Sequence, residues 1–551
     1  MSILMPVRNR HLVPLLLLFV VGAACNRAEK PVQRARTDEK RADAPQDGGT
    51  LVRRLVIDIV TLNPVRAASS NDGLVHKFLF TPVIYLDRNL QPIPGLAKSW
   101  TISPDGLTYR FELNENATFS DGSPVRGSDV VFTLRKIVDP TTEAPQVAGL
   151  FDQLDLTRTR ATGDHTIEVG FRQPWASQLI HFASVFVLPE HVYSKGDFNS
   201  DFNDLAVGSG PYKLVRRERG KEIIVERRAD YWRERPHIQT VVFKIIADHG
   251  TAWNALKLGE VDETILTSDT WLRERTNPAW TRTIDFQRFY RLGYNFIAWN
   301  SRRPLFADKR IRRAMAMCIP TDAIIRDLFH GTARAINGPF TPDEYAFNPS
   351  VPLIPFDPAG AQRILAAAGW IDRDADGVLD KGGKKFAFEM LVIPGNAVTT
   401  QFMQTVQAEL KKIGVQLNIR AVDGAAVMQQ ARAGNFDSAY LAWQLDADPD
   451  PHSLFHSSQF PPRGQNFVFY SSPEADRLID DARREMDDAK RKRLYWRLHE
   501  VLADDQPYTW TVQVSTKSGV RKRLHGVRTS GGYGLFMWYP GEFDWWIPQH
   551  D

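Results

Sequence analysis

Three carboxylates follow a short apolar run in the C-terminal half of the chain. Residues 439–443 read Ala-Tyr-Leu-Ala-Trp, a run of the length expected for a buried strand. The run is followed by Asp446, Asp448 and Asp450, and the prolines at 449 and 451 prevent a helix. Ligands of open α/β sheets bind outside the carboxyl ends of strands, and an aromatic surface beside a fixed anion suits a small cationic or amphoteric molecule. Trp443 and Asp446 are therefore the candidate ligand-binding residues, and an acidic surface turn is the alternative.

A second acidic segment matches the first half of a calcium-binding EF-hand loop. The matching positions are Asp372, Asp374, Asp376 and Gly377, with Asp380 at the ninth position. The twelfth position is Gly383, where an EF-hand has a bidentate glutamate. The missing ligand favours a polar connector over a calcium site.

His452 and His456 lie four residues apart, a spacing that can chelate zinc from one face of a helix. No third ligand is evident beside them, so the pair is interpreted as coincidental and no metal site is predicted. The sequence has no G-x-S-x-G, H-E-x-x-H or C-x-x-C motif and no phosphate-binding loop. We therefore expect no catalytic residues and no cofactor.

Length and composition indicate a globular protein of several domains. The 551 residues exceed the roughly 250–300 at which a single core stops growing, so two or three domains are expected. The contents of hydrophobic residues, 43%, and of charged residues, 24%, are ordinary for such a protein. A net charge of +4 is small against 69 basic and 65 acidic side chains, and nothing in it indicates a nucleic-acid partner.

The N-terminus has the order of a secretory signal. A basic start is followed by the apolar residues 12–21 and by Gly22-Ala23-Ala24, which predicts a signal peptide over residues 1–24. A cysteine directly after small residues is typical of bacterial lipoproteins, so Cys25 is the predicted lipidation site.

Only Cys25 and Cys318 are present, so there is no disulfide framework, and Cys318 is expected to be a buried lone thiol. Residues 25–47 are highly charged and predict a flexible, lipid-anchored tether.

Short blocks of strand, turn and helix residues follow one another from residue 48 to residue 547, and Ser128 can cap a helix over 129–136. They include GGTL at 48–51, PGLAKSW at 94–100, SPDGLTYRFEL at 103–113, SDVVFTLRK at 128–136 and VGSGPYKL at 207–214. In this order the blocks resemble those of the extracellular solute-binding proteins of family 5. That family contains the oligopeptide- and dipeptide-binding components of bacterial ABC importers.

The resemblance implies an α/β, bilobal periplasmic-binding-protein (type II) fold with an extra subdomain inserted in the first lobe. The implied division is residues 48–68, 187–290 and 517–551 for lobe I, 69–186 for its inserted subdomain, and 291–516 for lobe II. Residues 290–299 and 516–520 are the implied crossing segments, and hinges are typically a few residues at the ends of elements.

The resemblance also implies a ligand and partners. In peptide-binding members, an aspartate three residues after a tryptophan pairs with the ligand's α-ammonium, and Asp446 and Trp443 match that pattern. The implied protein is a monomer, periplasmic or at the cell surface. It is anchored to a membrane by lipid, and it passes peptides or another small solute to an ABC permease with its ATPase subunits.

Two alternatives remain from the sequence. The same fold could bind an oligosaccharide, a metal chelate or an opine-like compound, and the 14 tryptophans make sugars plausible. A remote alternative is a secreted glycoside hydrolase that uses paired carboxylates.

Overall fold

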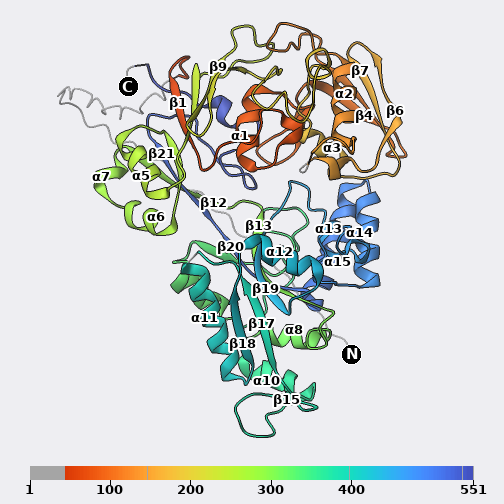
Figure 1. Ribbon diagram of the computed structural model, residues 1–551, viewed down its shortest axis with the longest axis vertical. Helices are drawn as coiled ribbons and strands as arrows, with labels where there is room; N and C mark the ends of the chain where they lie inside the picture. The colour runs from red at the N-terminus through yellow and green to blue at the C-terminus, as the bar shows by residue number, and fades with distance from the viewer. Residues whose placement is uncertain (1–43, 145–146, 396, 537, 550–551) are drawn as a thin grey trace, which may run out of the picture. The chain divides into compact units, whose positions relative to one another are not determined.

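The computed structural model describes residues 44–144, 147–395, 397–536 and 538–549 (Figure 1). The predicted signal peptide, Cys25 and most of the predicted tether lie outside these residues. From residue 45 onward the chain forms one compact unit.

Cys318 is a buried free thiol, as expected, and burial raises its pKa to about 12. Among the described residues no helix is long and apolar enough to cross a bilayer.

A seven-stranded mixed sheet organises the first part of the unit. Its strands β9 (Glu222–Arg227) and β10 (Thr240–Ile245) alternate buried and half-buried residues, the pattern of strands with one face on a core. In spatial order its strands are β12 (Ile284–Phe289), β21 (Thr516–Arg521), β11 (Glu263–Leu266), β1 (Thr50–Leu55), β10 (Thr240–Ile245), β9 (Glu222–Arg227) and β8 (Tyr212–Glu218). The helices of this part are α1 (Ser70–Leu79), α5 (His249–Leu258), α6 (Ser268–Glu274) and α7 (Pro278–Thr281).

A four-stranded antiparallel sheet is inserted between β1 and β8 in the sequence. Its inward-facing Tyr109, Phe111 and Leu113 belong to the same apolar core as Leu51 and Val241 of the seven-stranded sheet. The strands are, in order, β4 (Ala97–Ile102), β5 (Thr108–Leu113), β7 (Thr166–Phe171) and β6 (Leu154–Gly163), with helices α2 (Gly127–Val138), α3 (Gln178–His181) and α4 (Glu190–Tyr193). A small ribbon of β2 (Ile84–Leu86) and β3 (Pro92–Pro94) lies beside them in the sequence. Because they share a core, the two sheets are together called lobe I.

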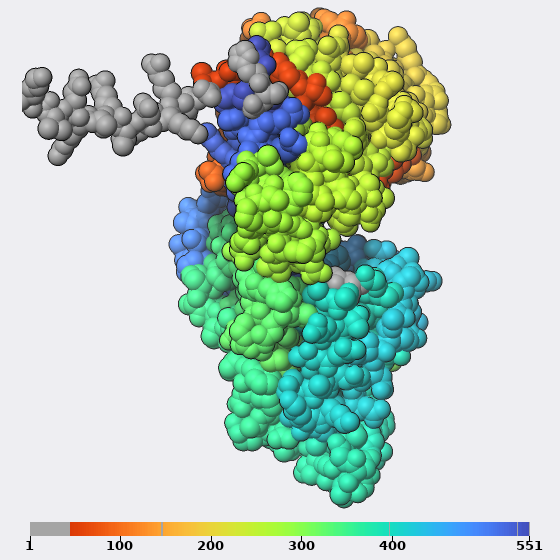
Figure 2. All heavy atoms as spheres, turned by 90° about the vertical axis from the view of Figure 1, so that its left-hand side faces the viewer, coloured from red at the N-terminus to blue at the C-terminus, as the bar shows by residue number. Residues whose placement is uncertain are grey.

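A six-stranded mixed sheet has separate apolar cores of its own and is called lobe II. Its strands are, in order, β14 (Ala333–Ala335), β20 (Tyr508–Val514), β13 (Gly293–Trp299), β19 (Ser438–Gln444), β17 (Ala387–Val392) and β18 (Gln416–Ala421). Its helices are α8 (Lys309–Ala316), α9 (Thr321–Ala323), α10 (Pro358–Ala367), α11 (Ala397–Lys412), α12 (Gly424–Ala433), α13 (His452–Phe455), α14 (Pro473–Arg484) and α15 (Asp488–Asp505), and a hairpin of β15 (Asp380–Lys381) and β16 (Lys384–Lys385) completes it. In Figure 2 the colours of residues near 250 and of residues near 400 occupy separate regions of the surface.

The chain crosses between the two large sheets twice. β12 ends at Phe289 in the seven-stranded sheet, and β13 begins at Gly293 in the six-stranded sheet. β20 and β21 belong to different sheets and are separated only by Ser515. The Ser515 amide donates a 3.1 Å hydrogen bond to the carbonyl of Thr332, so the second crossing is anchored to lobe II. That these crossings act as a hinge stays a prediction.

Candidate functional site

The predicted strand before the three aspartates is β19, which is confirmed and lies between β13 and β17. Its first four residues are buried, whereas Ala442 and Gln444 are exposed, so the strand leaves the core at its carboxyl end. Trp443 is half-buried there. Its ring lies 6.0 Å from that of Phe296 at an interplanar angle of 15°, and its Nε1 donates a 3.3 Å hydrogen bond to the Tyr508 hydroxyl. The indole is therefore a fixed wall.

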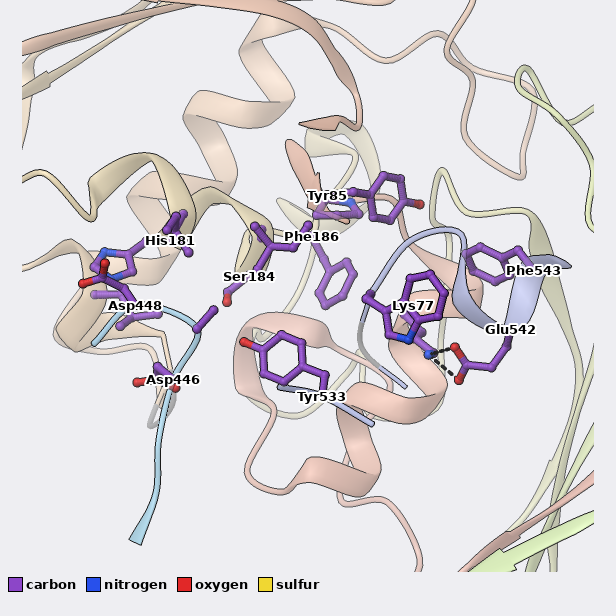
Figure 3. A pocket seen from close by; sticks show the side chains of 17 residues that line it. Lys77, Tyr85, His181, Ser184, Phe186, Asp446, Asp448, Tyr533, Glu542 and Phe543 are labelled. Carbon is purple, nitrogen blue, oxygen red and sulfur yellow. Dashed lines mark hydrogen bonds and ion pairs between the residues drawn. The ribbon is translucent and has the colours of Figure 1, made fainter. Parts of the chain in front are cut away.

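Asp446 lies two residues beyond β19, where two cavities meet. The first, of about 110 Å³, is lined by both lobes (Figure 3), and its lobe I residues include Lys77, Tyr85, His181, Phe186 and Tyr533. The second, of about 200 Å³, is lined by lobe II alone and includes Trp443, Phe340 and Leu454. The Asp446 carboxylate thus reaches the space between the lobes, with the indole wall on its own side.

The three aspartates have different partners. Asp446 is solvent-accessible and has no hydrogen bond or ion pair with any residue that the structure describes. Asp448 is buried and accepts a hydrogen bond from the Ser177 hydroxyl of lobe I. Asp450 pairs with Arg483, with 3.0 Å between Oδ2 and Nε, and accepts the His452 amide at 3.0 Å. Asp446 is thus the one solvent-accessible carboxylate of the three without a protein partner among the described residues, whereas Asp448 is buried with only its Oδ1 unpaired.

The surroundings of Asp446 are acidic. Desolvation, and then the charge of Asp450, raise the pKa of Asp446. Burial raises the pKa of Asp448 to about 6, against the opposing effects of Arg491 and Ser177. Burial also raises the pKa of Glu344 to about 7, and Asp343 and Asp448 add to this shift. Carboxylates that are costly to ionise together favour a cationic group among them.

A larger cavity of about 710 Å³ adjoins the first, with which it shares Ile180 and Ala447. Lobe I contributes apolar residues, including Leu90 and Trp100, and lobe II contributes charged ones, including Glu344, Arg491 and Lys492. Its volume lies within the range of about 300–1,000 Å³ that is usual for ligand pockets.

One wall of the cleft is a direct contact between the lobes at residues 175–177. The Ala176 amide donates a 2.8 Å hydrogen bond to the carbonyl of Arg483 at the end of α14. The Arg483 guanidinium lies 4.5 Å from the centre of the Trp175 ring. Together with the Ser177–Asp448 hydrogen bond, these contacts hold lobe I against lobe II.

The acidic loop at 372–380 is neutralised by the protein itself. Lys385 Nζ lies 2.6 Å from an oxygen of Asp374 and 2.9 Å from one of Asp376. Arg373 Nη1 lies 2.7 Å from Asp380 Oδ1. An ammonium among these carboxylates supports the interpretation as a connector.

Sequence reasoning missed most of the residues that surround Asp446. Glu344, His181 and Tyr533 line the cavities at which Asp446 lies, yet they are remote from it in the sequence. No motif marks them, because only the folded chain brings these segments together.

The chain is similar in sequence to a family of solute-binding proteins and to known peptide-binding proteins. The family model described as bacterial extracellular solute-binding proteins, family 5 (middle region), matches residues 91–466. The oligopeptide-binding protein AppA of Bacillus subtilis is 28% identical over 527 residues, with 93% of this chain and 94% of that protein covered. The di/tripeptide-binding protein 1 of Pseudomonas aeruginosa is 25% identical over 472 residues, with 81% and 85% covered.

Solved structures share the fold. The structure of Bacillus subtilis AppA in complex with a nonapeptide matches with a TM-score of 0.75 and 26% identity, covering 92% of this chain and 100% of that one. NikA from Brucella suis in complex with Fe(III)-EDTA matches with a TM-score of 0.78 at 21% identity, covering 90% and 99%. The predicted bilobal α/β fold is thereby confirmed.

Proposed function

Since the chain belongs to the bacterial extracellular solute-binding proteins of family 5, we propose that it captures peptides between its lobes and delivers them to the permease of an ABC importer. A bound nonapeptide in the structure of the similar AppA supports a peptide ligand. The observation that carries the proposal is the unpaired Asp446 carboxylate in a cleft lined by both lobes. The chain itself catalyses no reaction.

In the proposed complex, Asp446 accepts hydrogen bonds from the α-ammonium of the peptide. A charge-assisted N–H···O bond in an enclosed, water-poor cleft is stronger than the same pair at a surface. The contact is made to the one cation that every free peptide carries, so it holds peptides of many sequences. Trp443 packs against the first residue as an apolar wall.

Closure of the two lobes is the proposed mechanism of delivery. A ligand that contacts both lobes binds best when they are closed, so it shifts the population toward the closed form that a permease can recognise. The two crossings are the proposed hinge, with lobe bounds as implied by the sequence. The ATPase subunits of the importer supply the energy for transport.

We infer that the N-terminal segment attaches the protein to a membrane. In this proposal residues 1–24 are a signal peptide, Cys25 is acylated, and residues 25–47 are the tether of a monomeric lipoprotein that is periplasmic or at the cell surface. Metabolic labelling with an alkyne fatty acid should tag the wild-type chain, and Cys25→Ser should abolish both the label and membrane attachment.

Titration calorimetry tests the ligand proposal. Peptides with a free amino terminus should bind the wild-type protein, and N-acetylated versions should bind at least about 10-fold more weakly, because hydrogen bonds to charged groups contribute about 1.5–3 kcal/mol. Asp446→Asn should cause a similar loss, whereas Asp481→Asn, at an exposed position of α14, should not. Tight binding of sugars or metal chelates alone would reject the peptide assignment.

A further inference from the structure

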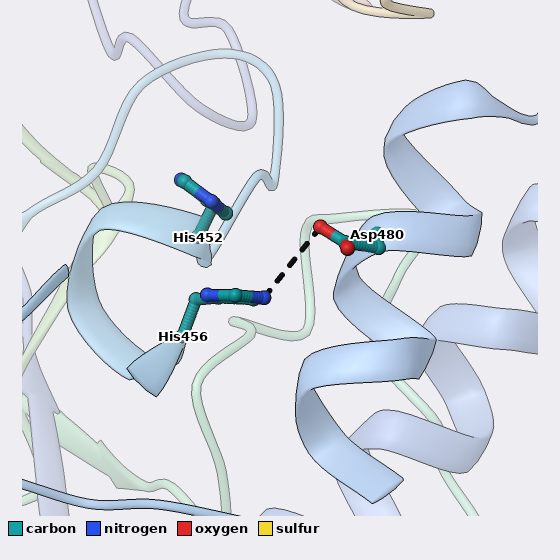
Figure 4. A group of neighbouring side chains, drawn as sticks. All are labelled: His452, His456 and Asp480. Atoms are coloured by element: carbon teal, nitrogen blue, oxygen red, sulfur yellow. Dashed lines mark ion pairs between the residues drawn. The ribbon is translucent and has the colours of Figure 1, made fainter. Parts of the chain in front are cut away.

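Two imidazoles and a carboxylate converge between α13 and α14, at a place that the peptide proposal does not use. His452 begins α13 and His456 follows its last residue, and their ring centres lie 4.8 Å apart. Asp480 lies on α14, and Figure 4 shows the His456 ring pointing at its carboxylate. One ligand-type atom from each of the three residues lies within 4.8 Å of the others.

The spacing is close to that of a zinc site. Zinc binds histidine nitrogen and carboxylate oxygen at about 2.0–2.2 Å, so ligand atoms of a tetrahedral site lie about 3.3 Å apart. His456 Nε2 is 3.6 Å from Asp480 Oδ1, and the His452 ligand atom lies within 4.8 Å of both, so modest side-chain rotations would bring the three atoms to that spacing. All three residues are half-buried, which leaves a fourth position open to water.

The histidines can present free lone pairs to an ion. The His452 imidazole has no hydrogen bond or ion pair with any described residue, and it lies beside His456 and Asp480. His456 Nδ1 accepts the Ser458 amide at 3.1 Å and lies 2.7 Å from the Ser458 hydroxyl, so a neutral ring has its proton on Nε2, facing Asp480. A metal on Nε2 replaces that proton, and the ring proton is then on Nδ1, where the Ser458 hydroxyl accepts it. Such an outer partner is usual for metal-bound histidine.

Neighbouring charges leave the third ligand available. Asp480 uses its other oxygen, Oδ2, toward Arg484, at 3.6 Å. Asp476 adds a second carboxylate, with Oδ1 4.0 Å from His456 Nε2, although it also accepts the Ser457 amide at 2.9 Å. The two carboxylates beside the imidazoles offset the positive charge of Arg483 nearby.

We propose that His452, His456 and Asp480 bind a divalent transition-metal ion of the zinc type. Imidazole nitrogen with one carboxylate suits zinc, nickel or copper, whereas calcium and magnesium require more oxygen ligands. The ion joins α13 to α14. It thereby fixes the segment that carries Asp450, whose side chain already accepts the His452 amide. The site is separate from the one proposed for peptides, and each can be tested without the other.

Calorimetry with zinc on the full, tag-free chain tests the site. Wild-type protein should bind one zinc ion, and cobalt in its place should give the intense visible absorption of a four-coordinate site. His452→Gln, His456→Gln and Asp480→Asn should each weaken zinc binding by at least about 100-fold, since loss of an outer partner alone costs about 10–100-fold. His330→Gln and Asp481→Asn, both at exposed positions of lobe II, should bind as the wild type does.

Peptide affinity without metal serves as the folding control, because each variant should retain it. The proposal is overturned if wild-type protein binds no zinc, if the three variants bind it as tightly as the wild type, or if bound cobalt shows only the weak spectrum of a six-coordinate aqueous ion. Binding of calcium or magnesium in preference to zinc would overturn it as well.

Discussion

At the scale of single residues, the three aspartates that follow β19 differ in their availability to a ligand because they have different partners. Asp448 and Asp450 follow Asp446 at alternate positions, yet each is tied to the fold, one by Ser177 and the other by Arg483. A carboxylate that already has a partner gains little from a ligand, whereas an unpaired one gains a charge-assisted bond. Whether an aspartate of this segment is structural or free to bind a ligand depends on the partners that lobe I and α14 supply, which are Ser177 and Arg483.

Glu344 gives a prediction about pH. Its pKa of about 7 in the folded protein lies above the ordinary value of 4.5, so the folded state binds the proton more tightly than the unfolded state does. Stability therefore falls as the pH rises from about 4.5 to 7. Glu344→Gln removes this loss and should raise the free energy of unfolding at pH 8 by about 1–3 kcal/mol relative to its effect at pH 4.5, at about 1.4 kcal/mol per pKa unit.

Urea denaturation of both proteins at the two pH values measures this difference. Glu260→Gln, at an exposed position, is the matched control and should show no dependence on pH. An equal effect of Glu344→Gln at pH 4.5 and pH 8 would show that the side chain ionises as freely as it does in water.

At this scale, the sequence predicted the two candidate residues that lobe II contributes to the site. Trp443 and Asp446 were identifiable because an apolar run ends in an acidic, proline-broken turn. The structure places both at the cavity of lobe II, and Asp446 also at the cavity lined by both lobes. Their role as ligand contacts remains a prediction. The sequence did not identify Asp480 as the partner of His452 and His456. Asp480 lies on a later helix, and only packing of α14 on α13 brings it near the histidines.

At the scale of elements, α14 fixes the position of Arg483. Ser472 caps the helix by accepting the Ala475 amide, and Pro473 occupies its first turn. Glu474 and Asp476 lie in the first turn and Arg483 and Arg484 in the last, so the charges complement the helix dipole. The last turn then presents Arg483 to Asp450 and to Trp175 of lobe I.

Arg483→Ala should weaken peptide binding by about 10-fold, because it removes a contact between the lobes of about 1–2 kcal/mol and leaves Asp450 without its partner. Stopped-flow measurement should find the change mainly in the dissociation rate. Arg484→Ala, at the exposed neighbouring position, should leave the rate unchanged. Equal rates for both variants would show that this contact does not hold the lobes together.

Gly293 begins β13 at the first crossing and has a φ of 149°, a value that side chains disfavour. A Cβ there would lie 2.4 Å from the carbonyl oxygen of Trp443, which precedes its register partner Gln444 on β19. Gly293→Ala should therefore lower the free energy of unfolding by about 1–3 kcal/mol. Urea denaturation measures the loss, and Gly149→Ala, with open space around it, should change little. A loss no larger than that of Gly149→Ala would mean that the crossing shifts without strain.

Elements with strong local signals were predicted well. The run 439–443 became β19, and the acidic loop before Gly383 ends in the hairpin of β15 and β16. The neutralising Lys385 was not foreseen, because its approach depends on the register of that hairpin. The burial of β19 also differs from a fully buried strand, since its carboxyl end emerges at the cleft.

At the scale of the whole unit, a buried ion group ties the C-terminal segment to lobe I. Arg53 of β1 lies 2.9 Å from Glu542, and Lys77 of α1 contacts the same carboxylate. All three side chains are buried. Removing one partner from such a group leaves buried charge without full compensation.

Glu542→Gln should lower the free energy of unfolding by about 3–5 kcal/mol, because Arg53 and Lys77 would then share no anion between them. Thermal or urea unfolding measures this loss. Asp544→Asn, two residues later and exposed, should have little effect. A loss below about 1 kcal/mol would show that water or Glu263, 3.6 Å from Arg53, compensates.

The fold class could be predicted from the order of short blocks, most of which encode a turn into a strand and one of which, residues 128–136, lies in α2. The crossings could be placed only approximately, since strands on either side of them have the same apolar character. Contacts such as Arg53 with Glu542 join positions hundreds of residues apart, and no local pattern reports them.

The last two strands have a consequence for biosynthesis. β20 lies between β14 and β13, and β21 lies between β12 and β11, so both are interior strands of their sheets. A nascent chain on the ribosome has a gap in each sheet until residues 508–521 have been translated. Unfilled strand edges of this kind aggregate unless they are shielded. Throughout most of translation neither large sheet can therefore be completed, and stable folding follows synthesis of this C-terminal segment.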